Sequence, residues 1–358
     1  MCDVTNSILA EDFERIWEEK IPWELLENKF VLITGANGMI ARYLLFYFAY
    51  LVKKKNVNVR VYAQSRNKDE LKRFLENLKC SEIECFDYDL KSKLETDDWV
   101  FHYIFHAASL ASPDFYEVMP TSVILPNVIG TYWLCEYART HSVCRLLFFS
   151  SSEIYGKMSD SVVSNYNEEM YGWIDPLDVR NCYSESKRMG ENLCISYYKE
   201  YGIPINIVRI FHTYGPTMKY LNDNRVFCEF VRNVVNRKDI IIKGEGKAKR
   251  PFLYLSDACS ALFFIILTSN SGIAYNMSNE NQYFSINEFA EIVAETFHDR
   301  RISIKHEMRK EGEKYSVKKD ENVVTGSSAK LKSLGWEAKV GVSEGIRRTV
   351  SFLERNGI

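Results

Sequence analysis

The sequence of 358 residues lacks the patterns of cysteine and histidine that build metal centres or disulfide frameworks. Its nine cysteines are scattered, none of them forms a CxxC pair, and no cluster of histidine ligands accompanies them. These absences predict neither a zinc site nor any other metal site, and no disulfide framework. Unpaired thiols are typical of a reducing compartment, so we expect a cytoplasmic protein.

The sequence also lacks an excess of charge of either sign and a long apolar run. A formal net charge of -2 gives no electrostatic reason to expect nucleic acid or an anionic membrane surface as a partner. The longest apolar run, Tyr43 to Val52, is too short to span a bilayer and is expected to form a buried helix. Residues 1–20 carry acids and no apolar core, so no signal peptide is predicted.

Near the amino terminus, a strand, a glycine-rich loop and a helix follow one another. The run Phe30–Ile33 is typical of a buried strand, and it leads through Thr34–Ala41 into a helix rich in Leu, Tyr and Phe. The loop has the pattern Gly-x-x-Gly-x-x-Ala, whose glycines let the backbone approach a pyrophosphate that the helix N-terminus stabilises. This context favours a dinucleotide site over a plain turn. The residues predicted to bind the cofactor here are Gly35, Asn37, Gly38, Met39 and Ile40.

The second predicted strand, Val59 to Gln64, ends without the acidic residue that often binds the adenosine ribose hydroxyls. Ser65-Arg66-Asn67 stands there instead, and Ser65 and Arg66 are predicted to contact the cofactor. A missing carboxylate beside a cationic Arg66 suits the 2′-phosphate of NADP, whereas an Arg66 that stacks on adenine or faces solvent leaves NAD equally open. The sequence therefore predicts NAD or NADP as the cofactor.

Further strands and helices alternate after this point, which indicates a parallel, doubly wound sheet. Asp89 and Leu90 follow the third strand and are predicted to lie near the adenine. The fourth strand and its turn span 103–108, and Asn127 is expected at a helix start. These positions add Asp89, Leu90, Ala107, Ala108 and Asn127 to the predicted cofactor site.

A fifth strand, Arg145 to Phe149, ends in a run of three serines followed by Glu153. Functional groups gather at the carboxyl ends of strands in open α/β sheets, so we expect Ser151 to hydrogen-bond a substrate hydroxyl and Glu153 to act as an acid or base. A serine run also forms ordinary turns, and this alternative stays open.

Tyr183 and Lys187 are four residues apart and share one face of a predicted helix. An ammonium close to a phenol favours the phenolate, so Lys187 is expected to lower the pKa of Tyr183 and to make it a general base. The alternative for such a pair alone is a solvated helix face; the glycine-rich loop upstream favours the catalytic interpretation.

Together these motifs resemble the extended short-chain dehydrogenase/reductase family, and within it the nucleotide-sugar epimerases, dehydratases and decarboxylases. UDP-glucuronate decarboxylases are the most similar, from about residue 29 almost to the end of the chain. The segments that carry the resemblance are 108–113, 180–188, 209–216, 222–226, 244–250 and 254–257. Three departures stand out: Ser151 in place of the usual Thr, His212 in place of Asn, and Ser65-Arg66 in place of an acidic strand end.

The resemblance implies a Rossmann fold, an NAD(P)-dependent enzyme acting on a nucleotide sugar, and a homodimer. Tyr183, Lys187, Ser151 and Glu153 would be catalytic, and Tyr183 and Lys187 would also contact the cofactor. The implied substrate-binding residues are Ser109, Ser152, His212, Arg225 and Arg250. The implied reaction oxidises the sugar at C4 and then loses carbon dioxide from C5, before the hydride returns. Loss of water or epimerisation, net NADPH-dependent reduction of a keto sugar, and a non-catalytic dinucleotide sensor are the alternatives.

The expected fold is therefore α/β, a Rossmann doubly wound parallel sheet with a smaller α+β substrate-binding domain. We expect a helical extension at 1–28 and the dinucleotide-binding domain at 29–210, with a returning segment near 254–278. Residues 211–358 are expected to be mainly the substrate-binding domain. Ser285 and Glu288 have the spacing of a capping box and predict a helix start there.

Overall fold

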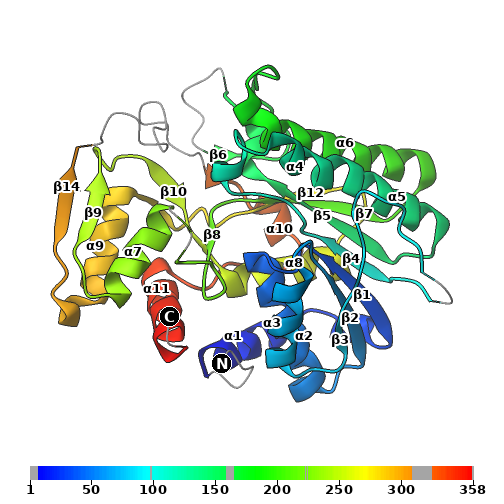
Figure 1. Ribbon diagram of the computed structural model, residues 1–358, viewed down its shortest axis with the longest axis horizontal. Helices are drawn as coiled ribbons and strands as arrows, with labels where there is room; N and C mark the ends of the chain where they lie inside the picture. Colours follow the sequence, from blue (N-terminus) through cyan, green and yellow to red (C-terminus); the bar gives the residue numbers. More distant parts are fainter. Residues whose placement is uncertain are drawn as a thin grey trace.

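Seven parallel strands form the central sheet, in the order β12-β7-β5-β4-β1-β2-β3 (Figure 1). This computed structural model describes residues 7–96, 99–158, 165–221, 223, 225–308 and 325–356. The parallel order and the helices on both faces confirm the expected Rossmann fold. The strands are β1 (Lys29–Thr34), β2 (Val59–Gln64), β3 (Ile83–Cys85), β4 (Tyr103–His106), β5 (Arg145–Ser151), β7 (Ile205–Ile210) and β12 (Ala274–Met277).

The direction of strand succession reverses beside β1, which pairs with β2 on one side and with β4 on the other. Thr34, the last residue of β1, is in register with Gln64 of β2 and His106 of β4. The carboxyl ends of these strands thus meet at one edge of the sheet. In an open α/β sheet this switch point is where ligands bind.

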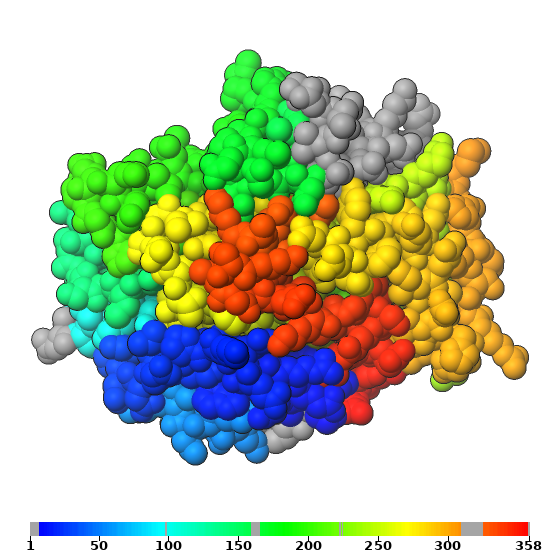
Figure 2. Space-filling model, turned by 180° about the vertical axis from the view of Figure 1, so that it is seen from behind, coloured from blue at the N-terminus to red at the C-terminus, as the bar shows by residue number. Residues whose placement is uncertain are grey.

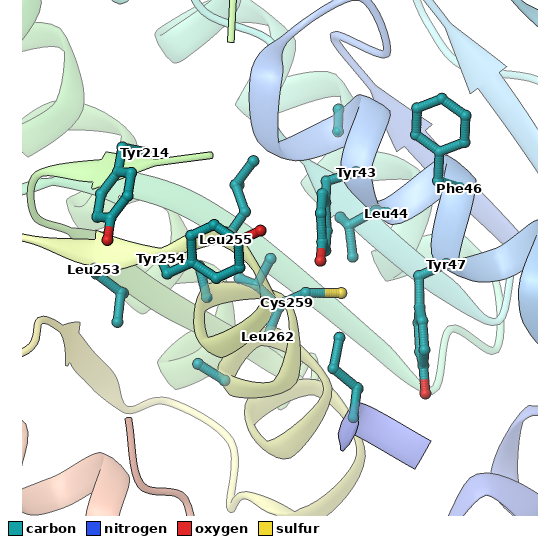
Figure 3. Close-up of a cluster of buried hydrophobic side chains, with 14 of the residues drawn as sticks. Tyr43, Leu44, Phe46, Tyr47, Tyr214, Leu253, Tyr254, Leu255, Cys259 and Leu262 are labelled. Carbon is teal, nitrogen blue, oxygen red and sulfur yellow. The ribbon is translucent and has the colours of Figure 1, made fainter. Parts of the chain in front are cut away.

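Two hydrophobic layers cover the sheet because successive strand residues point to opposite faces. Val31 and Ile33 of β1 pack in one core with helices α2 (Met39–Lys55), α3 (Lys68–Leu78) and α8 (Leu255–Thr268). Leu32 packs in the other, with α5 (Thr131–Thr140) and α6 (Cys182–Tyr201). Figure 3 shows Tyr43, Leu44 and Tyr47 of α2 beside Cys259 and Leu262 of α8. The apolar run 43–52 is therefore part of a buried helix, as predicted.

Helix α6 approaches the sheet at a glycine. A Cβ on Gly190 would lie 2.8 Å from the carbonyl oxygen of Asn127 and would also clash with the ring of Phe148 on β5. Only a residue without a side chain fits between these neighbours. Gly190 thereby sets the depth at which the first turn of α6, with Tyr183 and Lys187, lies against the end of β5.

One predicted helix start is wrong. Asn127 lies inside a continuous helical segment, in a π-turn at Pro126–Gly130 that joins α4 (Pro120–Leu125) to α5. The proline ring cannot donate a hydrogen bond, and a π-turn absorbs that interruption without ending the helix.

Smaller sheets and further helices make up most of the chain after β7. The strand pairs are β8 (Thr213–Tyr214) with β11 (Leu253–Tyr254), β9 (Ile240–Lys243) with β14 (Ile304–Glu307), β10 (Lys249–Pro251) with β13 (Tyr283–Ser285), and β6 (Asn165–Tyr166) with β15 (Thr325–Gly326). The helices are α7 (Val226–Val235), α9 (Ile286–Thr296), α10 (Ala329–Lys332) and α11 (Val342–Arg355). Helix α9 begins at the predicted capping box of Ser285 and Glu288.

The amino-terminal helix α1 (Ser7–Trp17) packs between α8, α2 and α11. On the face shown in Figure 2 the blue amino-terminal segment and the red carboxyl-terminal helix lie side by side. Phe13 and Ile16 of α1 are buried in the core that α2 and α8 share. The division into three domains stays a prediction, and residues 1–6 of the expected extension lie outside the described residues. Among the described helices, none has the length and apolar character needed to cross a membrane.

Candidate active site

The glycine-rich loop lies at the switch point and packs against the turn that follows β4. Gly35 has φ +68°, and a Cβ there would lie 2.6 Å from Cα of Ala108. Both the conformation and the close approach require glycine. Gly38 is exposed and directly precedes α2, so the free backbone N–H groups of Met39 and Ile40 begin the helix. The structure thus brings together the 35–40 loop and residues 107–108.

At the end of β2, Ser65 and Asn37 form a polar contact. The Asn37 Nδ2 group donates to Ser65 Oγ at 2.8 Å and to the carbonyl oxygen of Asn67 at 2.8 Å. Arg66 is exposed. Asp89 is also exposed and pairs with Lys91, whereas Leu90 is buried in the core beneath the sheet.

Buried polar atoms without a hydrogen-bond partner test whether these residues fit a dinucleotide. Among the described residues they include Ser109 Oγ, Asn127 Oδ1 and Arg42 Nε. Most buried polar groups in proteins are paired, so such atoms indicate a missing ligand or water. All three belong to segments of the predicted cofactor and substrate site: Ser109 follows Ala108, and Arg42 lies in the first turns of α2. Together with the free N-terminus of α2, these unpaired polar atoms fit a bound dinucleotide.

Tyr183, Ser151 and Lys187 meet where the first turn of α6 faces the end of β5. The Tyr183 hydroxyl is hydrogen-bonded to Ser151, and its ring stacks on Tyr116 with centroids 5.0 Å apart. Lys187 Nζ lies 5.7 Å from the centre of the Tyr183 ring and donates to the carbonyl oxygen of Phe149 at 2.6 Å. The expected shared helix face is present, and all three side chains are buried.

The expected lowering of the Tyr183 pKa is wrong. Burial, followed by the nearby Glu153 carboxyl, raises the pKa of the Tyr183 hydroxyl above its ordinary value, although the Ser151 hydrogen bond and the Arg225 charge oppose this. Burial also lowers the pKa of Lys187 to about 7, while Glu191 acts in the opposite direction. Desolvation is the largest cause of both pKa shifts, and Tyr183 rests in its protonated form.

Glu153 lies in a short 3₁₀ turn after β5, at Ser152–Tyr155. Its side chain reaches solvent, and its Oε2 accepts a hydrogen bond from Ser184 Oγ at 3.3 Å. The protein atoms packed around it raise the pKa of the Glu153 carboxyl, against the effect of Arg180 and Ser184. Ser152, the predicted neighbour on the substrate side, is half-buried.

A group of basic side chains lies near Tyr183. Burial, then the charges of Arg225 and Arg250, lower the pKa of His212 to about 3, so this ring is neutral. Arg225 also acts on Tyr183, and it pairs with Asp223 at 2.5 Å. Arg250 is half-buried, and within the described residues no acidic side chain pairs with it. Of the substrate segment 222–226, Asn222 and Asn224 lie outside the described residues.

Sequence reasoning missed two supports of this site. Tyr116, which stacks on Tyr183, comes from a loop that shows no recognisable motif. Glu191 pairs with Arg209 at 2.8 Å beneath the site and accepts a hydrogen bond from Ser150 at 2.5 Å. Because Glu191 lies four residues after Lys187, helix spacing alone would have placed the two on one face.

A doubly wound parallel sheet with a glycine-rich loop at its switch point defines a dinucleotide-binding α/β protein of the extended short-chain dehydrogenase/reductase type. The chain belongs to the NAD dependent epimerase/dehydratase family, whose model matches residues 31–278. It is therefore an enzyme of this NAD-dependent class. The resemblance stated from the motifs is confirmed.

Individual proteins agree with this assignment. UDP-glucuronic acid decarboxylase 6 of Arabidopsis thaliana is 32% identical over 321 residues, which cover 89% of this chain and 87% of the relative. A UDP-glucose 4-epimerase from Thermotoga maritima, solved with UDP-glucose, is 20% identical with a TM-score of 0.73, over 92% of this chain and 100% of that one. A Bacillus cereus UDP-glucuronic acid 4-epimerase, solved with UDP-glucuronic acid and NAD, has a TM-score of 0.72 at 20% identity, over 91% and 99%. The two structures share the fold.

Proposed function

We propose that this enzyme modifies a nucleotide-activated sugar by oxidation at C4 and that its reaction is that of a UDP-glucuronate decarboxylase. One observation carries the proposal. The Arg225 charge acts on both Tyr183 and His212, so a diphosphate bound by Arg225 and Arg250 would hold its sugar beside Tyr183. Guanidinium groups bind phosphate oxygens through charge-assisted hydrogen bonds. The neutral His212 adds no third positive charge beside them.

The dinucleotide would be held by the 35–40 loop, residues 65–66, 107–108 and Asn127. When bound in its oxidised form, it supplies a hydride acceptor for C4 and a positive charge that favours the ionised form of a neighbouring phenol. The pyrophosphate would lie at the N-terminus of α2, where free N–H groups and the helix dipole favour an anion.

Tyr183 and Ser151 would handle the proton of the C4 hydroxyl. In the resting site burial keeps Tyr183 protonated, so positive charge brought next to it would favour its ionised form. The Ser151 hydroxyl, already hydrogen-bonded to Tyr183, would orient the substrate oxygen between them. Lys187, whose Nζ is held by the Phe149 carbonyl, would add positive charge near Tyr183 when its amine is protonated.

Glu153 would act on the neighbouring carbon. A sugar oxidised at C4 with a carboxylate on C5 is a β-keto acid, which loses carbon dioxide and leaves negative charge at C5. That carbon then needs a proton. Burial raises the pKa of the Glu153 carboxyl, which favours its proton-carrying form, and this carboxyl lies close enough to Tyr183 to influence the ionisation of that hydroxyl.

The test measures carbon dioxide release and product mass with UDP-glucuronate, while absorbance at the nicotinamide band is followed. A redox-neutral decarboxylase should convert many equivalents of substrate with only trace dinucleotide present and no net change in absorbance. One reduced dinucleotide consumed or formed for each product, without carbon dioxide, would contradict the proposal. UDP-, GDP-, CDP- and dTDP-linked sugars in the same assay identify the nucleotide.

A 4,6-dehydratase is the second candidate, and Glu153 is the observation that favours it. The same carboxyl beside Tyr183 would drive loss of water if C5 carried a hydroxymethyl group. A product 18 mass units lighter than a nucleotide-linked hexose, rather than one 44 units lighter than the glucuronate, would identify this reaction. A net NADPH-dependent reductase would instead consume reduced dinucleotide in the same assay.

We further propose a cytoplasmic homodimer. The eight cysteines among the described residues are all free, which supports a reducing compartment. Helices α4, α5 and α6 lie together on one side of the sheet (Figure 1), and exposed apolar side chains on them support a contact with a second copy.

A further inference from the structure

A buried carboxylate lies beneath the catalytic side chains and has no part in the reaction steps given above. Glu191 belongs to α6, one helical turn after Lys187, and its side chain is buried. Ser150 of β5 and Arg209 of β7 are in register on neighbouring strands, so their side chains point to the same face of the sheet. Both side chains donate hydrogen bonds to Glu191. One carboxylate therefore joins α6 to two strands of the sheet.

The Arg209 guanidinium holds this carboxylate in place. Its Nε and Nη2 groups donate to Glu191 at 3.0 and 2.8 Å. The remaining hydrogens are donated to the hydroxyls of Tyr155 and Tyr171, each at 3.1 Å, and to the carbonyl oxygen of Glu168 at 2.9 Å. All five N–H groups thus have acceptors, and Arg209 is only 1% exposed. Neither partner of the pair is free to turn away from the other.

Three consecutive residues at the end of β5 each contact a different residue of α6. In chain order the pairs are Phe149 with Lys187 at 2.6 Å, Ser150 with Glu191 at 2.5 Å, and Ser151 with Tyr183. The Glu191 contact is the middle one, between the two that hold the catalytic side chains. Its loss should therefore disturb the alignment of the strand end with the helix.

Glu191 is also the anion that faces Lys187. The titratable groups around Lys187 are Tyr183, Glu191 and Cys194 from its own helix and His106 from β4. Burial raises the pKa of the Tyr183 hydroxyl and of the Cys194 thiol, so both stay protonated. Burial, followed by the Lys187 charge, lowers the pKa of His106 to about 3, so this ring is neutral. Strand β7 contributes Arg209, which pairs with Glu191.

We propose that Glu191 is a positioning residue for the oxidation at C4: it holds Ser150 against α6, and with it Ser151, and it supplies the negative charge that balances the Lys187 ammonium. The inference rests on the reaction of the proposed function and adds a residue that acts only through its neighbours. An opposite charge favours the charged form of an amine, so without this carboxylate Lys187 loses its proton at lower pH.

The test separates the charge of Glu191 from its role in folding. Glu191→Gln alone would leave Arg209 buried without a counter-charge, so it is combined with Arg209→Met, because neutral replacement of both partners of a buried pair is often tolerated. The full chain carries lysine labelled at Cε, and the Lys187 signal is identified by its loss in Lys187→Arg. Its titration midpoint should fall by about one pH unit or more in the double variant. Glu200→Gln, exposed near the end of the same helix, is the matched control and should leave the midpoint unchanged.

Rates of carbon dioxide release from UDP-glucuronate test the effect on the reaction. In the double variant the alkaline limb of kcat/KM should move to lower pH together with the Lys187 midpoint, which a purely structural role would not produce. Ser150→Ala removes the hydrogen bond and keeps the charge, so it should lower kcat roughly tenfold and leave KM and the Lys187 midpoint nearly unchanged.

Two results would overturn the proposal: a folded double variant whose Lys187 midpoint equals that of the parent, or a Ser150→Ala variant as fast as the parent. A parent enzyme that releases no carbon dioxide would contradict the proposed function instead. The Lys187 midpoint needs no turnover, so it would still decide whether the Glu191 charge acts on Lys187.

Discussion

Asp12, near the start of the chain, lies 2.7 Å from Nε of Arg348, near its end. Asp12 is fully buried and also accepts hydrogen bonds from Tyr43 on α2 at 3.0 Å and from Tyr254 of β11, directly before α8, at 2.9 Å. One carboxylate therefore joins the amino-terminal helix, the first helix of the dinucleotide fold and the carboxyl-terminal helix. Because its partners come from α2, β11 and α11, removal of this carboxylate should weaken the packing of α1 against all three elements.

Arg348→Met should lower the free energy of unfolding by about 3–5 kcal/mol, because it leaves a buried carboxylate without its cationic partner. Arg347→Met, at the exposed neighbouring position, should change it by about 0.5 kcal/mol or less. Chemical denaturation measures both. Asp12→Asn combined with Arg348→Met should cost less than the sum of the single changes, and strict additivity would contradict a direct pair.

Tyr183→Phe should lower turnover by about 10²- to 10⁴-fold, the contribution typical of a positioned acid–base group. Only the hydroxyl is removed, so the stacking on Tyr116 and the binding of dinucleotide and substrate should persist. Tyr198→Phe, on the same helix, is the control. Steady-state rates and calorimetric affinities test this together; a rate within a few-fold of the parent would remove Tyr183 from the mechanism.

Arg250→Ala should weaken binding of the nucleotide sugar by about 1.5–3 kcal/mol and leave dinucleotide affinity nearly unchanged. The side chain of Arg250 is half-buried beside His212 and has no acidic partner among the described residues. Its positive charge is therefore available to a bound anion. Titration calorimetry with UDP measures the effect. Arg73→Ala, an exposed arginine on α3, should have none, and unchanged UDP affinity in Arg250→Ala would reject the assignment.

Asp257 should contribute a decrease in the stability of the protein as pH rises from about 4 to 7. Burial raises the pKa of this carboxyl to about 7, although the backbone N–H groups of Val340 and Lys339 oppose the shift. The folded protein therefore binds more protons than the unfolded chain in this window, and the free energy of unfolding decreases with pH by up to about 1.4 kcal/mol per unit for one such group.

Asp257→Asn should remove that contribution to the pH dependence, because an amide does not titrate. Denaturation curves at several pH values between 4 and 8 measure the slope for the parent and the variant. Asp299→Asn, at an exposed position, should leave the slope unchanged. An identical slope in parent and Asp257→Asn would contradict the raised pKa.

Light scattering at micromolar concentration should report a dimer. Tyr132 on α5 and Met189 on α6 are exposed apolar side chains on neighbouring helices. The double change Tyr132→Glu and Met189→Glu should shift the population toward monomer, because charge is poorly tolerated in an interface core. Met308→Glu is the control, since Met308 is almost fully exposed after β14. A parent protein that is monomeric would end the dimer proposal.

Much of the fold followed from local patterns. The strand, the glycine loop and the buried helix after it could be predicted because their signals lie within a few residues of one another. Ser285 and Glu288 form their capping box through contacts only three residues apart. Strand β2 begins and ends where its apolar alternation does. In each case the forces that select the structure act within a single element, and the sequence displays them directly.

Tertiary packing decided what the local patterns could not. Asn127 was expected at a helix start, but α4 continues through a π-turn because the segment packs beneath α6, near Gly190. The pKa of Tyr183 was expected to fall, and it rises. Desolvation is a sum over atoms from distant segments, and spacing along one helix carries no information about that sum.

The sequence by itself determined the order of the strands along the chain, the loop that can hold a pyrophosphate and the side chains with catalytic chemistry. The tertiary structure alone decided which of those side chains are buried, which are charged and which distant residues join them. Asp12 and Arg348 are 336 positions apart and meet only because four helices converge. Chemical type is a property of one residue, whereas ionisation and pairing are properties of its surroundings in the folded chain.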